Sequence, residues 1–296
     1  MKQSYNAPMH TPPDDSTHAS LGQALRGVRI VSIALNLPGP FALRRLLQMG
    51  AQATKIEPPG GDPMQAYSPA YYRELHQGVT LQRLDLKQKA DYSALAAQLD
   101  GAQLLISAQR PQALARLKLD WATVHGRWPH LNHLAIVGYA APRHNDAGHD
   151  LTYVAQLGLL QPPRLPPTLM ADLSGAERAV SAALALLRLS EKSATGSYVE
   201  IALEDAARDL AGPLRHGLTS EGGILGGGMA GYNLYRTADG WIALAALEEH
   251  FLERVVQGLG LARADAAKFS AAFQGETNAH WLAWAAEHDI PLNVVA

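Results

Sequence analysis

Short apolar segments alternate with longer amphipathic segments along the first two thirds of the chain. The short segments are rich in β-branched residues and are bounded by Gly or Pro, which is typical of buried strands. We expect strands at 28–35, 53–57, 81–86, 103–107, 134–137 and 198–203. Helical spacing is found at 41–49, 92–99, 151–160, 174–189 and 204–216. Strands separated by helices pair in parallel through right-handed crossovers. The pattern therefore predicts a doubly wound, mostly parallel (Rossmann-like) α/β sheet.

The remaining third of the chain has a different pattern. Glycines gather at 222–228, which is typical of a flexible loop. Two strand-like segments, 232–236 and 241–247, then flank the turn residues Ala238, Asp239 and Gly240 and indicate a hairpin. Helices are expected at 249–258 and 278–288. These elements predict a second, smaller α+β domain.

Domain boundaries follow from these changes of pattern. Residues 1–24 are polar and lack the apolar run of a signal peptide, so we expect a disordered tail. The large α/β domain is predicted over 25–212. A linker is predicted over 213–224 and the small α+β domain over 225–296.

Composition excludes several classes of function. The chain has 25 basic and 27 acidic residues, so it offers no basic surface for nucleic acid. Cysteine is absent, which excludes disulfides, zinc–thiolate sites and a cysteine nucleophile. His125, His130, His133 and His144 show no metal-ligand spacing; we predict that they are surface residues and that there is no metal site. No segment approaches the roughly 18 apolar residues of a membrane span, and we expect a soluble cytoplasmic protein.

Four local strings carry the chemical information. They are LRGVRI with GPFA at 25–30 and 39–42, AQATKIEPPGGDP at 51–63, AGHDLTY at 147–153, and YRTADG at 235–240 with Glu248. In this order they resemble the CaiB/BaiF family, the family III CoA-transferases, over nearly the whole chain. The resemblance implies an enzyme that acts on acyl-CoA thioesters and binds no permanent cofactor, with coenzyme A entering as part of the substrate. It also implies an intertwined homodimer.

One of these strings is similar to the α-methylacyl-CoA racemase branch of the family, in which a histidine lies between the glycine and the aspartate. The resemblance implies that His149 is one catalytic base and Asp172, in the string ADLSG, is the other. Glu248 would orient the histidine, with the adjacent Glu249 as the other candidate for this role. Inversion at the α-carbon removes a proton from one face and delivers one to the other, which requires two such groups. The predicted reaction is racemisation or epimerisation of a 2-methylacyl-CoA.

Two other functions stay open. In the transferases of the family, the aspartate matching Asp172 attacks the thioester and carries covalent intermediates, which implies CoA transfer between carboxylic acids. A non-catalytic CoA-binding relative is the third possibility. It is favoured because a cation present in most relatives is missing from the segment His76 to Gln82, and because a C-terminal family segment beyond Pro291 is missing. Purely structural roles at helix starts are open for His149 and Asp172.

The resemblance also implies a binding site for coenzyme A in the large domain. Its candidate residues are Glu57 and Pro58 after the second strand, Lys87, and Arg110. Cations meet the phosphates of such a ligand, while its adenosine stacks on an apolar loop surface.

Overall fold

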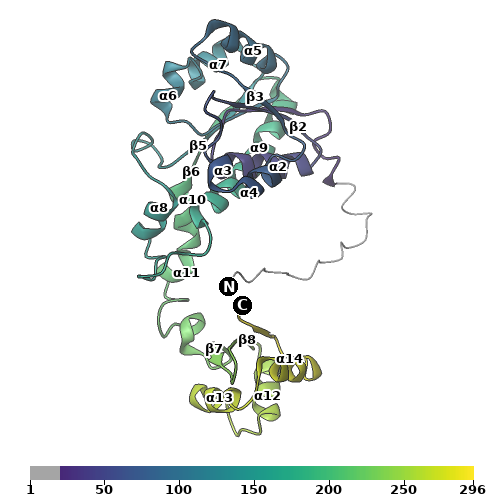
Figure 1. Cartoon of the computed structure of the whole chain (residues 1–296), viewed down its shortest axis with the longest axis vertical. Coiled ribbons are helices and arrows are strands. Elements are labelled where there is room, and N and C mark those ends of the chain that lie inside the picture. Colours follow the sequence, from purple (N-terminus) through teal and green to yellow (C-terminus); the bar gives the residue numbers. More distant parts are fainter. Residues whose placement is uncertain (1–20) are drawn as a thin grey trace. The chain divides into compact units, whose positions relative to one another are not determined.

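A computed structural model describes residues 21–296 (Figure 1). The predicted tail therefore lies outside the described residues except for 21–24, which form a turn before Leu25. The described chain divides into two compact units, one ending at Leu210 and the other covering Ala211–Ala296. No described helix is long and apolar enough to cross a membrane.

A six-stranded parallel sheet forms the centre of the first unit. Its strands are β1 (Arg29–Ser32), β2 (Gln52–Glu57), β3 (Thr80–Arg83), β4 (Leu104–Ser107), β5 (Asn132–Val137) and β6 (Tyr198–Ala202). They lie in the order β3-β2-β1-β4-β5-β6, with every neighbouring pair parallel. The predicted fold class is confirmed. The order reverses between β1 and β4, and in such sheets ligands bind in the crevice beyond the strand ends at this point.

Alternate residues along each strand face two different layers of helices. Ile30 and Leu104 pack in one core with α2 (Pro38–Gln48), α8 (Asp150–Gln156) and α9 (Met170–Ser193). Their neighbours Val31 and Leu105 pack in the other core with α5 (Lys89–Leu99), α6 (Pro111–Arg116) and α7 (Trp121–Arg127). Because successive side chains of a strand point to opposite faces, the two cores cover both sides of the sheet.

Helix boundaries depart from the prediction at several places. Helix α2 begins at Pro38 rather than at residue 41, since the fixed φ of proline and its missing N–H suit the first turn of a helix. Two short helices, α3 (Met64–Tyr67) and α4 (Pro69–Leu75), were not predicted, and neither were α6 and α7. Beyond β6 the chain forms α10 (Leu203–Leu210) and the single turn α11 (Gly212–Arg215).

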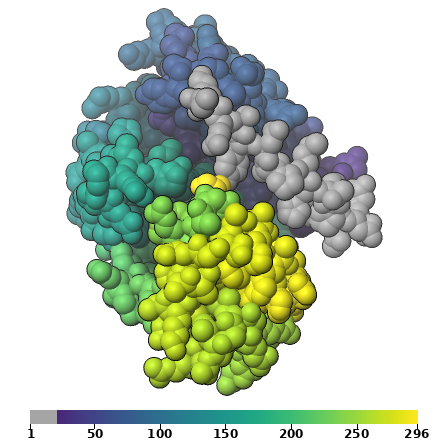
Figure 2. Space-filling view, turned by 60° about the horizontal axis from the view of Figure 1, so that its bottom comes forward, coloured from purple at the N-terminus to yellow at the C-terminus, as the bar shows by residue number. Residues whose placement is uncertain are grey.

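The second unit is a three-stranded antiparallel sheet packed with helices (Figure 1), and Figure 2 shows its surface in green to yellow. Strands β7 (Tyr232–Arg236), β8 (Trp241–Ala245) and β9 (Leu292–Val294) pack with α12 (Glu249–Gly258), α13 (Ala266–Phe273) and α14 (Asn278–Glu287). The glycine-rich segment is wound into a tight turn, η1 (Ile224–Gly228). A Cβ on Gly226 would lie 1.8 Å from the carbonyl oxygen of Ser220, so only glycine is accommodated there.

The prediction that His133 is a surface residue is wrong. Its side chain is fully buried in β5, with Nε2 2.8 Å from Ser107 Oγ, and burial lowers its pKa to about 4. An inner strand of a parallel sheet, such as β5 between β4 and β6, is covered on both faces, so even a polar residue there is buried.

Acidification should therefore destabilise the protein through His133. The unfolded chain takes up a proton near pH 6.5, whereas the folded chain takes it up only near pH 4, so stability is full above pH 6.5 and falls below it. The difference between the two pKa values of His133 corresponds to a loss of about 3 kcal/mol in the free energy of unfolding. Urea unfolding at about pH 7 and pH 4.5 should show a smaller acid loss in His133→Asn than in the wild type. Equal losses in both proteins would contradict this account.

Candidate active site

A cavity of about 210 Å³ lies at the carboxyl ends of β1, β4 and β5. This is the point where the strand order reverses. Its lining includes Asn36 after β1, Arg110 after β4, and Gly148, His149 and Tyr153 around the start of α8. Two of the predicted site residues, His149 and Arg110, are therefore brought to one cavity, which we name the switch-point cavity.

The start of α8 packs closely on the sheet because two nearby residues, Gly138 and Gly148, have no side chain. The ring of Tyr153 is buried, and a Cβ on Gly148 would lie 2.4 Å from its Cε1. A Cβ on Gly138 would lie 2.3 Å from the Tyr153 hydroxyl oxygen. The backbone N–H of His149 donates to Thr152 Oγ1 (3.0 Å), while the His149 side chain is exposed. The string AGHDLTY thus builds a helix start that presents His149 at the cavity.

Asp150 joins the starts of α8 and α9. Its Oδ1 accepts hydrogen bonds from the backbone N–H groups of Ala171 (2.6 Å) and Asp172 (3.0 Å). These are first-turn donors of α9, which have no partner inside the helix. The hydrogen bond from the Asp172 N–H to Asp150, the residue that follows His149, therefore links the two predicted bases.

Asp172 has an environment that favours its neutral form. Desolvation by burial raises its pKa to about 7, and the nearby charge of Asp150 contributes in the same direction. The other oxygen of Asp150, Oδ2, is buried and has no hydrogen-bond partner among the described residues. Carboxyl groups that share a poorly solvated region cannot both ionise easily. Near neutral pH, Asp172 can thus both take and give a proton.

Glu248, the third predicted catalytic residue, lies in the second unit. It directly precedes α12, and its backbone carbonyl accepts from the N–H groups of Phe251 and Leu252, both at 3.0 Å. Its side chain is exposed. An orienting role toward His149 stays a prediction.

A second cavity, of about 270 Å³, lies at the carboxyl ends of β1, β2 and β3. Glu57, Pro58 and Lys87 line it together with apolar residues of the same loops. Gln109 lines both this cavity and the switch-point cavity, so the two adjoin. Lys87 and Arg110 are exposed, and neither forms an ion pair with any residue in 21–296. The four residues predicted to bind coenzyme A therefore line two adjoining cavities.

The sequence profile of CoA-transferase family III matches residues 25–296. The chain belongs to this family. It is 26% identical over 257 residues to human α-methylacyl-CoA racemase, covering 80% of this chain and 65% of the racemase. It is 25% identical over 266 residues to succinate–glutarate CoA-transferase of Agrobacterium fabrum, covering 80% of this chain and 66% of the transferase. The chain thus spans slightly less than two thirds of the length of these curated relatives.

Solved structures of the family share the fold. A hypothetical protein of Mycobacterium tuberculosis superposes with a TM-score of 0.80 at 21% identity, covering 92% of this chain and 84% of that one. A CaiB/BaiF family protein of Brucella suis gives a TM-score of 0.78 at 20% identity, with the same coverages. Family III members are enzymes, and the relatives of this chain include both racemases and CoA-transferases. Membership alone therefore leaves the reaction open between these two classes.

In two of the family strings, contacts in the structure explain why a particular residue is present. In the string ADLSG, a Cβ on Gly175 would lie 2.3 Å from Leu203 Cδ2, so glycine allows the start of α10 to pack on α9 just after Asp172. In the string KIEPPGGDP, the carboxylate of Glu57 is buried and bound by other residues of the first unit. It accepts from the Tyr72 hydroxyl (2.8 Å) and lies 3.1 Å from Lys55 Nζ. Glu57 therefore shapes the cavity without offering its charge to a ligand.

Sequence reasoning missed the buried network to which Glu57 belongs. Lys55 and Tyr72 contact Glu57 directly, and Asp62 and His76 bind Lys55. A signal for them exists, because Lys55 and Glu57 lie two residues apart in a strand and so share one face. Two charged residues on one face of a buried strand require buried partners.

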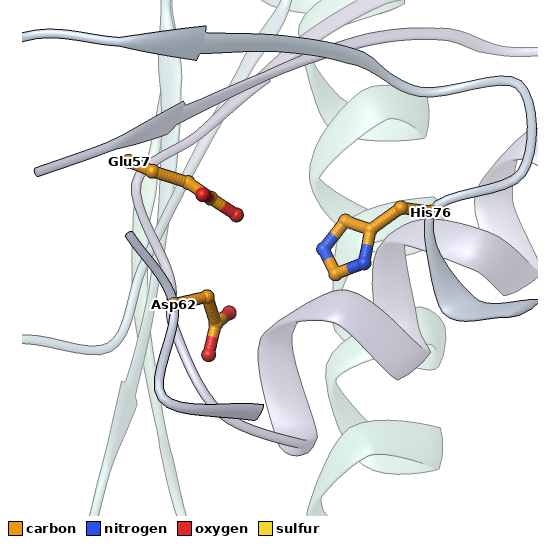
Figure 3. Close-up of side chains that lie close together, drawn as sticks. All are labelled: Glu57, Asp62 and His76. Carbon is orange, nitrogen blue, oxygen red and sulfur yellow. The ribbon is translucent and has the colours of Figure 1, made fainter. Parts of the chain in front are cut away.

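Glu57, Asp62 and His76 point toward one another, and their ligand-type atoms lie within 4.8 Å of each other (Figure 3). This arrangement resembles a metal site. However, Lys55 Nζ lies among them, 2.5 Å from Asp62 Oδ2, 2.8 Å from His76 Nε2 and 3.1 Å from Glu57 Oε1. The ammonium already supplies the cation for these groups, so the cluster is an ion-pair network.

Proposed function

We propose that the chain catalyses proton transfer at the α-carbon of a 2-methylacyl-CoA or a similar thioester, as an acyl-CoA racemase or epimerase. His149 and Asp172 are the two bases. The observation that carries this proposal is the pKa of Asp172, raised to about 7 beside the helix start that bears His149. General acid–base catalysis is most effective when the pKa of the catalytic group lies near the working pH.

The two residue types suit a reversible inversion. In one direction the deprotonated group on one side of the α-carbon removes its proton, and the protonated group on the other side delivers one. In the reverse direction the roles exchange. Burial raises the pKa of Asp172 to about 7, so this carboxyl group is present in both protonation states near neutral pH. Imidazole is the side chain most often used as the second proton-transfer group.

The transferase reaction would use only the ionised form of Asp172, whereas proton transfer in both directions uses both forms. A carboxylate that attacks a thioester must be ionised, and desolvation keeps a large share of Asp172 neutral at pH 7. The transferase alternative keeps one specific support, the similarity to succinate–glutarate CoA-transferase. In that reaction Asp172 would be the nucleophile and a second carboxylic acid would accept CoA.

For the thioester, we propose that the adenosine enters the second cavity over Pro58, with Lys87 and Arg110 meeting the phosphates. The acyl end then reaches the switch-point cavity and His149. The support is that the two cavities adjoin at Gln109 and that both cations are unpaired among the described residues. We further propose, from the resemblance, that the protein is a cytoplasmic homodimer and that Glu248 orients His149.

Proton NMR in heavy water, following deuterium entry at the α-carbon of 2-methylacyl-CoA, tests the proposed function. The wild type should exchange this proton, and His149→Ala should lower racemisation by about 10³-fold because one of two bases is lost. His130→Ala, which changes an exposed histidine elsewhere, is the matched control and should behave as the wild type.

Other results would reassign the protein. Absence of exchange in the folded wild type, together with CoA transfer to a carboxylic acid that survives His149→Ala, would establish the transferase alternative. Absence of both reactions, with CoA still bound, would indicate a non-catalytic relative.

A further inference from the structure

Lys55 lies at the centre of a buried polar network that is joined to the loops of the two cavities. Its side chain is 0% exposed. Its ammonium forms hydrogen bonds with Asp62 Oδ2 and His76 Nε2 and an ion pair with Glu57 Oε1 at 3.1 Å. A charge that has been removed from water requires such pairing.

The network requires His76 to be neutral and in one tautomer. Nδ1 of His76 lies 2.7 Å from the backbone carbonyl oxygen of Tyr72, to which it can only donate. Nε2 therefore carries the lone pair that accepts from Lys55 at 2.8 Å. A proton on Nε2 would remove this acceptor and place a second cation against the ammonium.

Asp62 extends the network to the backbone of both cavities. While its Oδ2 binds Lys55, its Oδ1 accepts from the N–H groups of Asn36 (3.1 Å) and Met64 (2.9 Å). Asn36 has a φ of 63°, a conformation that non-glycine residues rarely adopt, and it lines the switch-point cavity. Glu57, the other carboxylate on Lys55, begins the loop that lines the second cavity. One ammonium thus fixes the loops of both cavities.

We propose that Lys55, Asp62 and His76 form a positioning network for the CoA site, and that coenzyme A binds more weakly once His76 is protonated. The part concerning CoA rests on the proposed function. Lys55, Glu57 and Asp62 are the charged groups around the ring, and the Tyr72 ring lies against it, with centroids 4.1 Å apart and planes tilted by 37°. Burial first, and then the charge of Lys55, lowers the pKa of His76. The network is therefore intact at neutral pH and opens on acidification.

Calorimetric titration with free coenzyme A at about pH 7.5 and pH 5 tests the proposal on three full-length proteins. They are the wild type, His76→Gln and His130→Gln. The side chain introduced by His76→Gln places an amide oxygen near the position of Nε2, so it accepts from Lys55 but cannot be protonated. Acidification should weaken binding at least about ten-fold more in the wild type and in His130→Gln than in His76→Gln. Titration of the CoA phosphates is common to all three proteins and cancels in this comparison. Equal losses in all three would overturn the proposal.

Amide hydrogen exchange at Asn36 and Met64, whose N–H groups donate to Asp62 Oδ1, provides a readout that needs no ligand. Protection, corrected for the intrinsic effect of pH, should fall on acidification in the wild type and stay nearly constant in His76→Gln. The same fall in both proteins would overturn the positioning role. If no protein binds CoA at any pH, the proposed function fails at this site, while the exchange comparison still decides whether His76 controls these loops.

Discussion

Asp172→Asn should lower the catalytic rate by about 10³-fold or more, and it should at the same time stabilise the protein above pH 7. The loss of rate is expected because asparagine neither takes up nor gives a proton. The gain in stability follows from the pKa of about 7 in the folded protein against 3.8 for the ordinary carboxyl group. The stabilisation due to the neutral carboxyl is complete below about pH 4 and is lost as the pH rises through 7.

The size of the gain follows from the same shift. The full difference between the folded and unfolded pKa of Asp172 corresponds to about 4 kcal/mol of stability. We expect about 2–3 kcal/mol because Asp172 is partly exposed and solvent screens its charge. Urea unfolding at about pH 8 should show this advantage for Asp172→Asn, and unfolding near pH 4 should show almost none. Glu221→Gln, at an exposed site, is the control and should change stability little at either pH. An advantage independent of pH would contradict the desolvation of Asp172, and retained activity would contradict its catalytic role.

The fold could be predicted because its signals are local and repeated. Each buried strand is a short β-branched run, as in Val31 of β1 and Ile136 of β5, and the right-handed crossover rule then limits the arrangement of the sheet. The helices that were missed, such as α4 and α6, are only 7 and 6 residues long. So few residues carry little helical periodicity, and both helices begin at a proline that sequence reasoning treats as a break.

Site residues that lie within one short sequence string could be predicted. Contacts between residues far apart in the sequence could not. His149 and Arg110 were each found in a local string, and the structure places them at one cavity. Two further contacts could not be foreseen. Asp150 binds the start of α9 across a separation of 21 residues, and Lys55 meets His76 across another 21. Such contacts depend on how helices pack on the sheet, and periodicity contains no information on this.

Lys55→Met should destabilise the protein by about 3–5 kcal/mol, although methionine has a similar length and is more apolar. The reason is the pair of carboxylates that remains. Asp62 and Glu57 are 3% and 2% exposed, and without the ammonium their charges would be buried close together with no compensation. Urea unfolding at about pH 7.5 measures the loss, with the exposed Lys192→Met as the matched control.

Neutralising one of the two uncompensated carboxylates should restore part of the stability lost in Lys55→Met. In Lys55→Met/Glu57→Gln the remaining amide can still accept from the Tyr72 hydroxyl, which donates to Glu57 at 2.8 Å in the wild type. The double variant should therefore be more stable than Lys55→Met alone, by about 1–2 kcal/mol, even though Glu57→Gln alone destabilises the intact network. A double variant as unstable as the sum of the two single variants would show that the loss comes from packing around the lysine stem. Non-additivity of the expected sign would show that charge compensation by Lys55 keeps the loops of the two cavities in place.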